Sequence, residues 1–117
     1  MESILLVTDS NWVRNDVEAA ILDPTTSLTH VEDPRTVIAV AGQSPPSIYI
    51  VDMQVGSMGG MAITRAIKSA ANNGEIEDRP VVLLLDRSAD EFIARRAGAD
   101  RWVVKPFTAQ ALRAALG

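Results

Sequence analysis

Three short apolar runs in this chain each stop at a functional group: residues 4–7 at Thr8 and Asp9, residues 48–51 at Asp52, and residues 102–104 at Lys105. Uninterrupted apolar runs of this length are typical of parallel strands that are buried on both faces. If the three runs are neighbours in one parallel sheet, their carboxyl ends meet at one edge. Open α/β folds hold their ligands at that edge, so the pattern predicts a site there.

The rest of the chain alternates between strand and helix patterns. We expect strands at residues 3–8, 27–31, 47–51, 81–85 and 101–104. Apolar residues recur at helical spacing after each strand, as at Val13, Val17 and Ala20. Five strands alternating with five helices predict βαβ units in an α/β fold. Right-handed crossovers then favour a single doubly wound five-stranded parallel sheet of order 2-1-3-4-5.

Two helix starts carry specific capping signals. Ser88 followed by Glu91 predicts a capping box, and the helix that begins there should stop at Gly98. Thr108 is the expected cap of the last helix, with Phe107 packing on Leu112 as a hydrophobic staple.

Composition narrows the class of function. A chain of 117 residues suits one domain, and we take residues 1–117 as that domain. The absence of cysteine excludes disulfides, thiolate catalysis and zinc–cysteine sites. A net charge of -4 argues against general nucleic-acid binding, which needs a basic surface. Because no apolar stretch approaches the ~20 residues of a membrane span and no signal peptide is evident, we expect a cytoplasmic protein that is not bound to membranes.

The predicted edge has an electrostatic requirement. Adjacent strands lie ~4.8 Å apart, which would bring Asp9 and Asp52 close together. Two carboxylates ~4 Å apart repel each other by about 4 kcal/mol at an effective dielectric constant of 20. Lys105 supplies one compensating charge, and a divalent cation bound by oxygen ligands, Mg²⁺ being the expected one, would supply the rest. A carboxylate beside a cation and a lysine is equipped to attack phosphorus.

The sequence resembles the receiver domain of bacterial response regulators over nearly its full length. The matching segments are residues 4–9, 51–60 and 98–107. The resemblance implies a flavodoxin-like receiver fold in which Asp52 is the phosphoacceptor and Lys105 pairs with the phosphoryl group. It also implies that Asp9, Asp52 and the backbone carbonyl of Gln54 bind Mg²⁺. By the same resemblance the Lys105–Pro106 peptide bond is cis and Gly60 occupies a position that the family keeps as glycine.

Two departures from the family pattern concern the predicted site. Receivers usually carry two successive acids after the first strand, where this chain has Thr8 and then Asp9, so we expect weak Mg²⁺ binding. Asp86 occupies a position that usually holds a small residue. It would act either as a replacement metal ligand or as a charge that repels the phosphoryl group, unless it simply points to solvent. Thr8, Asp86 and the following Arg87 are therefore candidate modulators.

Two further departures concern the conformational switch of the family. Leu85 stands where receivers carry a threonine or serine that bonds the phosphoryl oxygen, and leucine has no hydroxyl. A lost hydrogen bond to a charged group is worth ~1.5–3 kcal/mol, so phosphorylation should switch the surface poorly. Trp102 occupies the position of the aromatic switch residue, and its bulk should keep it on one side permanently. The alternative is that Leu85 is an ordinary core residue and Trp102 an ordinary aromatic on an edge strand.

We expect a stand-alone response regulator in a two-component phosphorelay, not an enzyme, that takes a phosphoryl group from a histidine kinase or phosphotransfer protein. No DNA-binding domain follows Gly117, so the expected output is contact with a protein partner. The alternative is a divergent receiver that works as a phosphorylation-insensitive interaction module. A flavin- or nucleotide-binding enzyme is disfavoured because no glycine lies in the turn at residues 8–12.

Several other residues have less specific patterns. The last two strand–helix elements, which receivers use for partners, carry four arginines that either dock an acidic surface or form solvated helix faces: Arg95, Arg96, Arg101 and Arg113. We expect Trp12 to be a partly buried packing residue. His30, on the predicted edge strand, receives no functional role.

Overall fold

A computed structural model describes residues 2–21 and 23–117. The main sheet consists of five parallel strands in the order β2-β1-β3-β6-β7. Their bounds are Glu2–Val7 for β1, Thr26–Val31 for β2, Ile48–Asp52 for β3, Val81–Leu85 for β6 and Arg101–Val104 for β7. This is the predicted order 2-1-3-4-5, and the predicted strands differ from the observed ones by at most one residue at either end. The predicted α/β class and topology are therefore confirmed.

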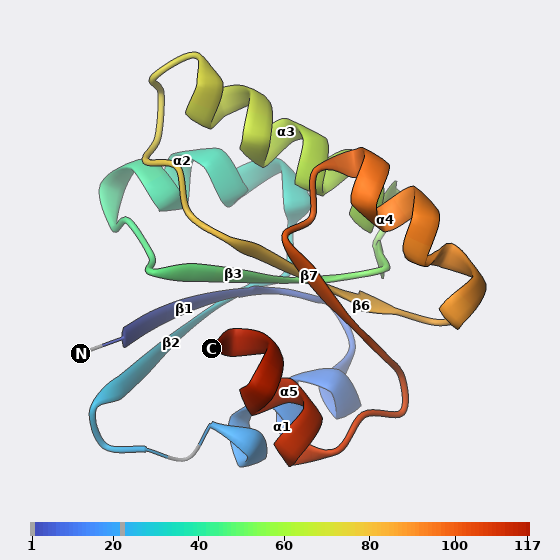
Figure 1. Ribbon diagram of the computed structural model, residues 1–117. Coiled ribbons are helices and arrows are strands. Elements are labelled where there is room, and N and C mark those ends of the chain that lie inside the picture. Colours follow the sequence, from blue (N-terminus) through green and yellow to red (C-terminus); the bar gives the residue numbers. More distant parts are fainter. Residues whose placement is uncertain (1, 22) are drawn as a thin grey trace.

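Five α-helices cover the two faces of the sheet. Helices α2, α3 and α4 lie on one face and α1 and α5 on the other (Figure 1). Their bounds are Asn11–Ala20 for α1, Val37–Gln43 for α2, Gly60–Asn72 for α3, Glu91–Ala97 for α4 and Ala109–Leu116 for α5. The short 3-10 helices Pro34–Thr36 and Ser88–Asp90 precede α2 and α4.

Each face of the sheet packs into its own apolar core, because successive side chains of a strand point to opposite faces. Leu5 and Leu83 join Ile63 and Ile67 of α3 in one core. Neighbouring strand residues point the other way, and Leu6 packs with Val17 and Leu112 in the second core. Burial on both faces explains why strands β1, β3 and β6 have continuous apolar sequences instead of alternating ones.

Several local features differ from the sequence-based expectations. The capping box predicted at Ser88 is wrong, because Ser88 lies inside a 3-10 helix and neither helix start there has a side-chain cap. The predicted stop at Gly98 is confirmed, with Gly98 in the left-handed conformation at φ +99°. Thr108 caps α5 as predicted, accepting a hydrogen bond of 3.0 Å from the Ala111 amide.

A small hairpin follows β3 that the sequence analysis did not predict. Its strands β4 (Gln54–Val55) and β5 (Met58–Gly59) are antiparallel and are joined by Gly56 and Ser57. Gly56 has φ +60°, a conformation that a side chain would strain. With only two residues in each strand, the hairpin has too short a pattern for sequence periodicity to detect.

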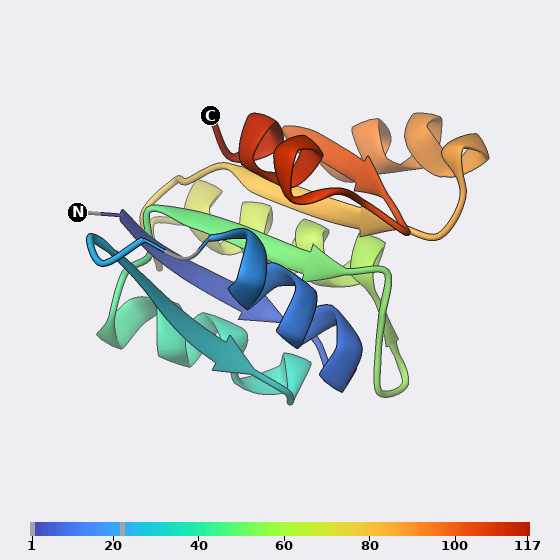
Figure 2. The same ribbon diagram turned by 90° about the horizontal axis from the view of Figure 1, so that it is seen from below.

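The carboxyl ends of all five main strands point to the same side of the molecule, and the hairpin lies at that side (Figure 2). The first residues of β1 and the C-terminal end of α5 lie at the opposite side of the sheet (Figure 2). None of the helices in the part of the chain that the structure describes is long and apolar enough to cross a membrane.

Candidate functional site

Asp52 is the centre of the site. It is the last residue of β3, and its side chain is only 4% exposed. One carboxylate oxygen, Oδ1, accepts hydrogen bonds from Lys105 Nζ at 2.5 Å and from the Met53 amide at 2.8 Å. The other, Oδ2, accepts one from the Thr8 hydroxyl at 2.7 Å. A buried carboxylate needs such donors, because desolvation penalises its charged form.

Thr8 reaches Asp52 because β1 and β3 are neighbours in parallel register. Val7 pairs with Val51, so the residues that follow them lie side by side at the edge of the sheet. Thr8 is fully buried, and its amide extends the pairing with β2 through a bond to the Val31 carbonyl. The predicted meeting of the first and third strand ends is therefore present, but it is the Thr8 hydroxyl that makes the contact between them.

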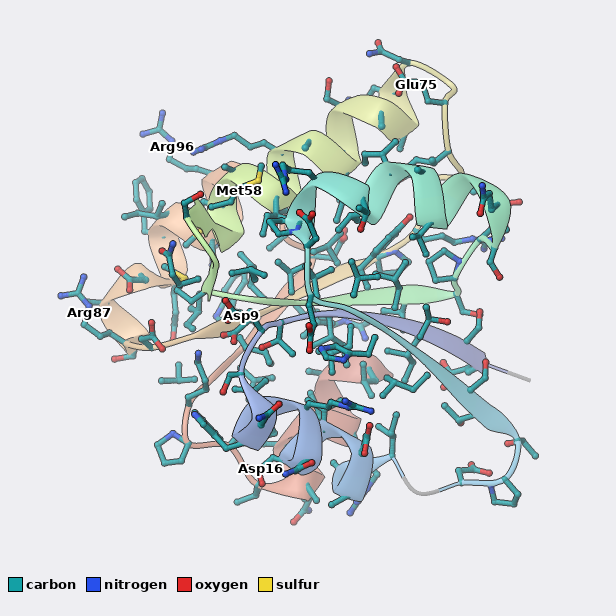
Figure 3. The ribbon with its side chains drawn as sticks, turned by 180° about the vertical axis from the view of Figure 1, so that it is seen from behind. Asp9, Asp16, Met58, Glu75, Arg87 and Arg96 are labelled. Atoms are coloured by element: carbon teal, nitrogen blue, oxygen red, sulfur yellow. The ribbon has the colours of Figure 1, made fainter. Side chains whose placement is uncertain are left out.

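Asp9 lies one residue further along and is bound to the hairpin. Its Oδ2 accepts a hydrogen bond of 2.8 Å from the Gly56 amide. Figure 3 shows Asp9 at the carboxyl edge of the sheet, on the same side of the molecule as Met58 of the hairpin. In the described residues no hydrogen bond joins Asp9 to Asp52, so the link between them runs through the loop that follows Asp52.

Lys105 directly follows β7, the edge strand two positions from β3 in the sheet. Its amide bonds to the Leu85 carbonyl at 2.7 Å, and the Lys105–Pro106 peptide bond is cis. Burial lowers the pKa of Lys105, but hydrogen bonds and attraction from Asp52 and Asp86 outweigh it and hold the pKa above its ordinary value. Lys105 is therefore a fixed positive charge at neutral pH.

Asp86 pairs with the same lysine. Its Oδ1 lies 2.9 Å from Lys105 Nζ, and its side chain is 59% exposed. Sequence reasoning left open whether Asp86 binds metal, repels the phosphoryl group or points to solvent. The structure gives it a half-exposed position with one carboxylate oxygen on Lys105.

Trp12 is a neighbour of the site that sequence reasoning missed. It lies in the first turn of α1 and is 50% exposed, and its ring centroid is 5.9 Å from Lys105 Nζ. This is a cation–π distance. Only tertiary contact between α1 and the loop after β7 brings the two together, so no spacing signal could have indicated the pair.

His30 also contacts the site after being assigned no role. Its Nε2 lies 2.7 Å from the Thr8 carbonyl oxygen. A carbonyl only accepts hydrogen bonds, so Nε2 carries the hydrogen and donates. His30 thus fixes the backbone of the residue whose hydroxyl binds Asp52. His30 lies on β2, pairs with Leu6 of β1, and is one residue before the carboxyl end of its strand.

Gly60 is required by the packing behind Asp52. A Cβ at Gly60 would collide with the backbone carbonyl oxygen of Asp52 and lie 3.0 Å from a Leu83 methyl group. The Gly60 amide donates to the Met53 carbonyl at 2.7 Å, which ties the start of α3 to the residue after Asp52. Gly60 therefore allows α3 to begin directly behind the site.

The two candidate switch residues, Leu85 and Trp102, pack into the same apolar core. Leu85 is fully buried in the core on the α3 face. Trp102 is half-buried against the same core, with the Arg95 guanidinium 5.5 Å from its ring centroid. Leu85 thus lies in the core, and Trp102 lies on the edge strand β7 with the guanidinium of Arg95, a residue of α4, over its ring.

The candidate arginines contact groups other than Asp9, Asp52 and Lys105. Arg87 is paired with Asp90 at 3.1 Å, and Arg96 lies over the Phe92 ring at 5.7 Å. The other two arginines of the last elements bond to backbone carbonyls, Arg101 to that of Ala115 and Arg113 to that of Ala20. The Gln54 side chain bonds to the Gly56 carbonyl within the hairpin.

The described residues hold no group of three histidine, cysteine or acidic side chains arranged for a metal ion. Asp9 and Asp52 nevertheless supply two carboxylates at one edge of the sheet. Among these residues Asp9 accepts a hydrogen bond only through Oδ2, and both oxygens of Asp52 accept bonds but keep lone pairs for a further ligand. Mg²⁺ commonly binds through one or two carboxylates and keeps several waters. The donor set therefore fits such an ion, though not an all-protein cage.

Comparison with known proteins gives one consistent family. The model of the response regulator receiver domain matches residues 4–117. The chain is 26% identical over 113 residues to the chemotaxis protein CheY of Pseudomonas aeruginosa, covering 94% of this chain and 89% of that protein. It is 27% identical over 108 residues to the probable transcriptional regulatory protein TcrX of Mycobacterium tuberculosis. That match covers 91% of this chain and spans 44% of TcrX.

Solved structures share the fold. The chemotaxis response regulator CheY4 of Vibrio cholerae superposes with a TM-score of 0.84 at 24% identity, covering 99% of this chain and 96% of that chain.

Proposed function

The chain belongs to the family of response regulator receiver domains, and on that premise we propose that it accepts a phosphoryl group on Asp52 with the help of Mg²⁺. The donor is a phosphorylated histidine of a kinase or phosphotransfer protein. The nitrogen–phosphorus bond of the donor breaks as a bond forms between phosphorus and an Asp52 oxygen. The electron pair of the broken bond stays on the imidazole, which takes up a proton.

The observation that carries this proposal is the pairing of buried Asp52 with Lys105 at 2.5 Å. Lys105 is positioned to bind oxygens of a phosphoryl group on Asp52, where charge gathers during the transfer. Asp9, Asp52 and the carbonyl of Gln54 would hold Mg²⁺, which neutralises phosphoryl charge when bound. Thr8 orients Asp52 through its hydroxyl but brings no charge, which supports weak metal binding.

One observation favours a second function. Leu85 is fully buried and carries no hydroxyl that could follow a phosphoryl oxygen. In that function the protein is an interaction module whose surface responds little to phosphorylation. In both functions the whole of residues 1–117 is one non-enzymatic signalling domain, and its output is contact with a protein partner through the last two strand–helix elements.

One experiment separates the two functions. The protein is incubated with Mg²⁺ and acetyl phosphate, and phosphorylation is followed by intact mass. Amide spectra are recorded with Mg²⁺ and beryllofluoride. Phosphorylation that vanishes in Asp52→Asn supports the proposal, and unmodified wild-type protein contradicts it. Amide shifts that reach Trp102 support the switching receiver, whereas shifts confined to the surroundings of Asp52 support the insensitive module.

A further inference from the structure

The Lys105 ammonium is enclosed by three groups from three elements. Asp52 of β3 and Asp86, directly after β6, lie 2.5 and 2.9 Å from Nζ. The Trp12 ring of α1 faces the same ammonium at 5.9 Å. The side chain of Lys105 is only 12% exposed. An ammonium has three hydrogens to donate, and two of them are already directed to carboxylates.

The two carboxylates on Lys105 have different surroundings. Asp52 is buried and has further donors in Thr8 and the Met53 amide. Asp86 is more than half exposed, and among the described residues Lys105 is its one ion-pair partner. A half-exposed carboxylate contributes little to stability through its ion pair. Its charge nevertheless lies 2.9 Å from the ammonium that also pairs with Asp52.

A phosphoryl group on Asp52 and the Asp86 carboxylate need the same ammonium. Asp86 occupies one of its hydrogens and adds a like charge close to the phosphoryl oxygens. We propose that Asp86 is a positioning residue that competes with the phosphoryl group for Lys105 and so lowers the affinity of the site for it. This inference rests on the proposed function, because it concerns the same carboxylate and the same ammonium.

The geometry disfavours the alternative in which Asp86 replaces the missing acid as a metal ligand. Its bonded oxygen is directed to Lys105, a cation that repels a divalent ion. In the part of the chain that is described, Asp86 forms no metal-binding group with Asp9 and Asp52. The two roles predict opposite results when the charge is removed.

The test is a beryllofluoride titration in Mg²⁺, followed by ¹⁹F NMR of the bound fluoride. Asp86→Asn removes the charge and keeps the size, and we expect binding about three- to tenfold tighter than in the wild type. Asp86→Glu keeps the charge and should restore the weaker binding. Glu91→Gln is the matched control, because Glu91 is an exposed acid in the first turn of α4 that makes no ion pair with Lys105. It should bind as the wild type does.

A second readout separates competition from a structural role. The chain has two tryptophans, so a Trp102→Phe background leaves Trp12 as the only one. Trp12 fluorescence emission should change when Lys105 moves to pair with bound beryllofluoride. Asp86→Asn should lower the beryllofluoride concentration at the midpoint of that change by the same factor as in the ¹⁹F titration. A substitution that only altered stability would move the urea midpoint and leave the binding midpoint unchanged.

Each outcome has a distinct meaning. Tighter binding by Asp86→Asn, including binding where the wild type shows none, supports the inference. Equal or weaker binding by Asp86→Asn, with a wild type that binds, overturns the inference and leaves the proposed function intact. If neither protein binds beryllofluoride in an Asp52-dependent manner, the inference and the proposed function both fail.

Discussion

The hydroxyl of Thr8 donates a hydrogen bond of 2.7 Å to Oδ2 of Asp52, across the boundary between the first and third strands. Both residues are buried. Thr8 stands at the position where receivers usually carry one of two successive acids. An acid there would add a negative charge near Asp52, whereas the Thr8 hydroxyl donates a hydrogen bond to it. The bond therefore stabilises the metal-free site and leaves less negative charge for a cation.

Thr8→Val tests this stabilisation, because valine keeps the shape of threonine and removes the donor. We expect a loss of about 1–3 kcal/mol in the free energy of unfolding, since a buried carboxylate loses a partner. Urea denaturation measures it. Thr8→Ser keeps the hydroxyl and should lose clearly less. Equal stability of wild type and Thr8→Val would show that the bond contributes nothing.

Gly60→Ala tests the close approach of α3 to the site. Its Cβ meets the backbone oxygen of Asp52, which cannot rotate away, so we expect a loss of about 1–3 kcal/mol or more. Gly59→Ala is the matched control, because a Cβ at Gly59 has no neighbour within 4 Å. Thermal or urea denaturation compares the two. Equal effects of both substitutions would contradict the steric account.

Asp9→Asn separates metal binding from folding. The amide oxygen of asparagine can still accept the hydrogen bond of the Gly56 amide, so we expect stability within about 0.5 kcal/mol of the wild type. Loss of the charge should weaken Mg²⁺ binding at least about tenfold, because the cation loses one of two carboxylates. Titration calorimetry measures the affinity. Asp16→Asn, on the exposed part of α1, serves as control, and unchanged Mg²⁺ affinity in Asp9→Asn would exclude Asp9 as a ligand.

Leu85→Thr tests whether the missing hydroxyl limits switching. We expect the amide shifts caused by beryllofluoride to become larger and to reach Trp102. Because Leu85 is fully buried, the substitution should also cost about 2–4 kcal/mol of stability. Leu85→Val removes volume without adding a hydroxyl and should leave the shifts as they are. An unchanged response in Leu85→Thr would show that another departure is limiting.

The fold could be predicted because it follows from local patterns. Runs such as residues 81–85 are apolar at every position, which is typical of a strand buried on both faces, and their spacing leaves room for one helix between neighbouring strands. The hairpin after Asp52 was missed because strands of two residues have no measurable period. The capping box at Ser88 failed because a 3-10 turn took up the residues that would have formed it.

The sequence alone determined the strand order and the meeting of Asp52 with the end of β1 and with Lys105, because each of these residues directly follows or ends an apolar run. Tertiary structure decided which atoms meet at that edge. Thr8 rather than Asp9 bonds to Asp52, Asp9 bonds to Gly56, and Asp86 and Trp12 close around Lys105. The physical reason is that strand register places backbones to within a residue, whereas side-chain partners depend on loops and helices whose positions are set only when the two cores pack.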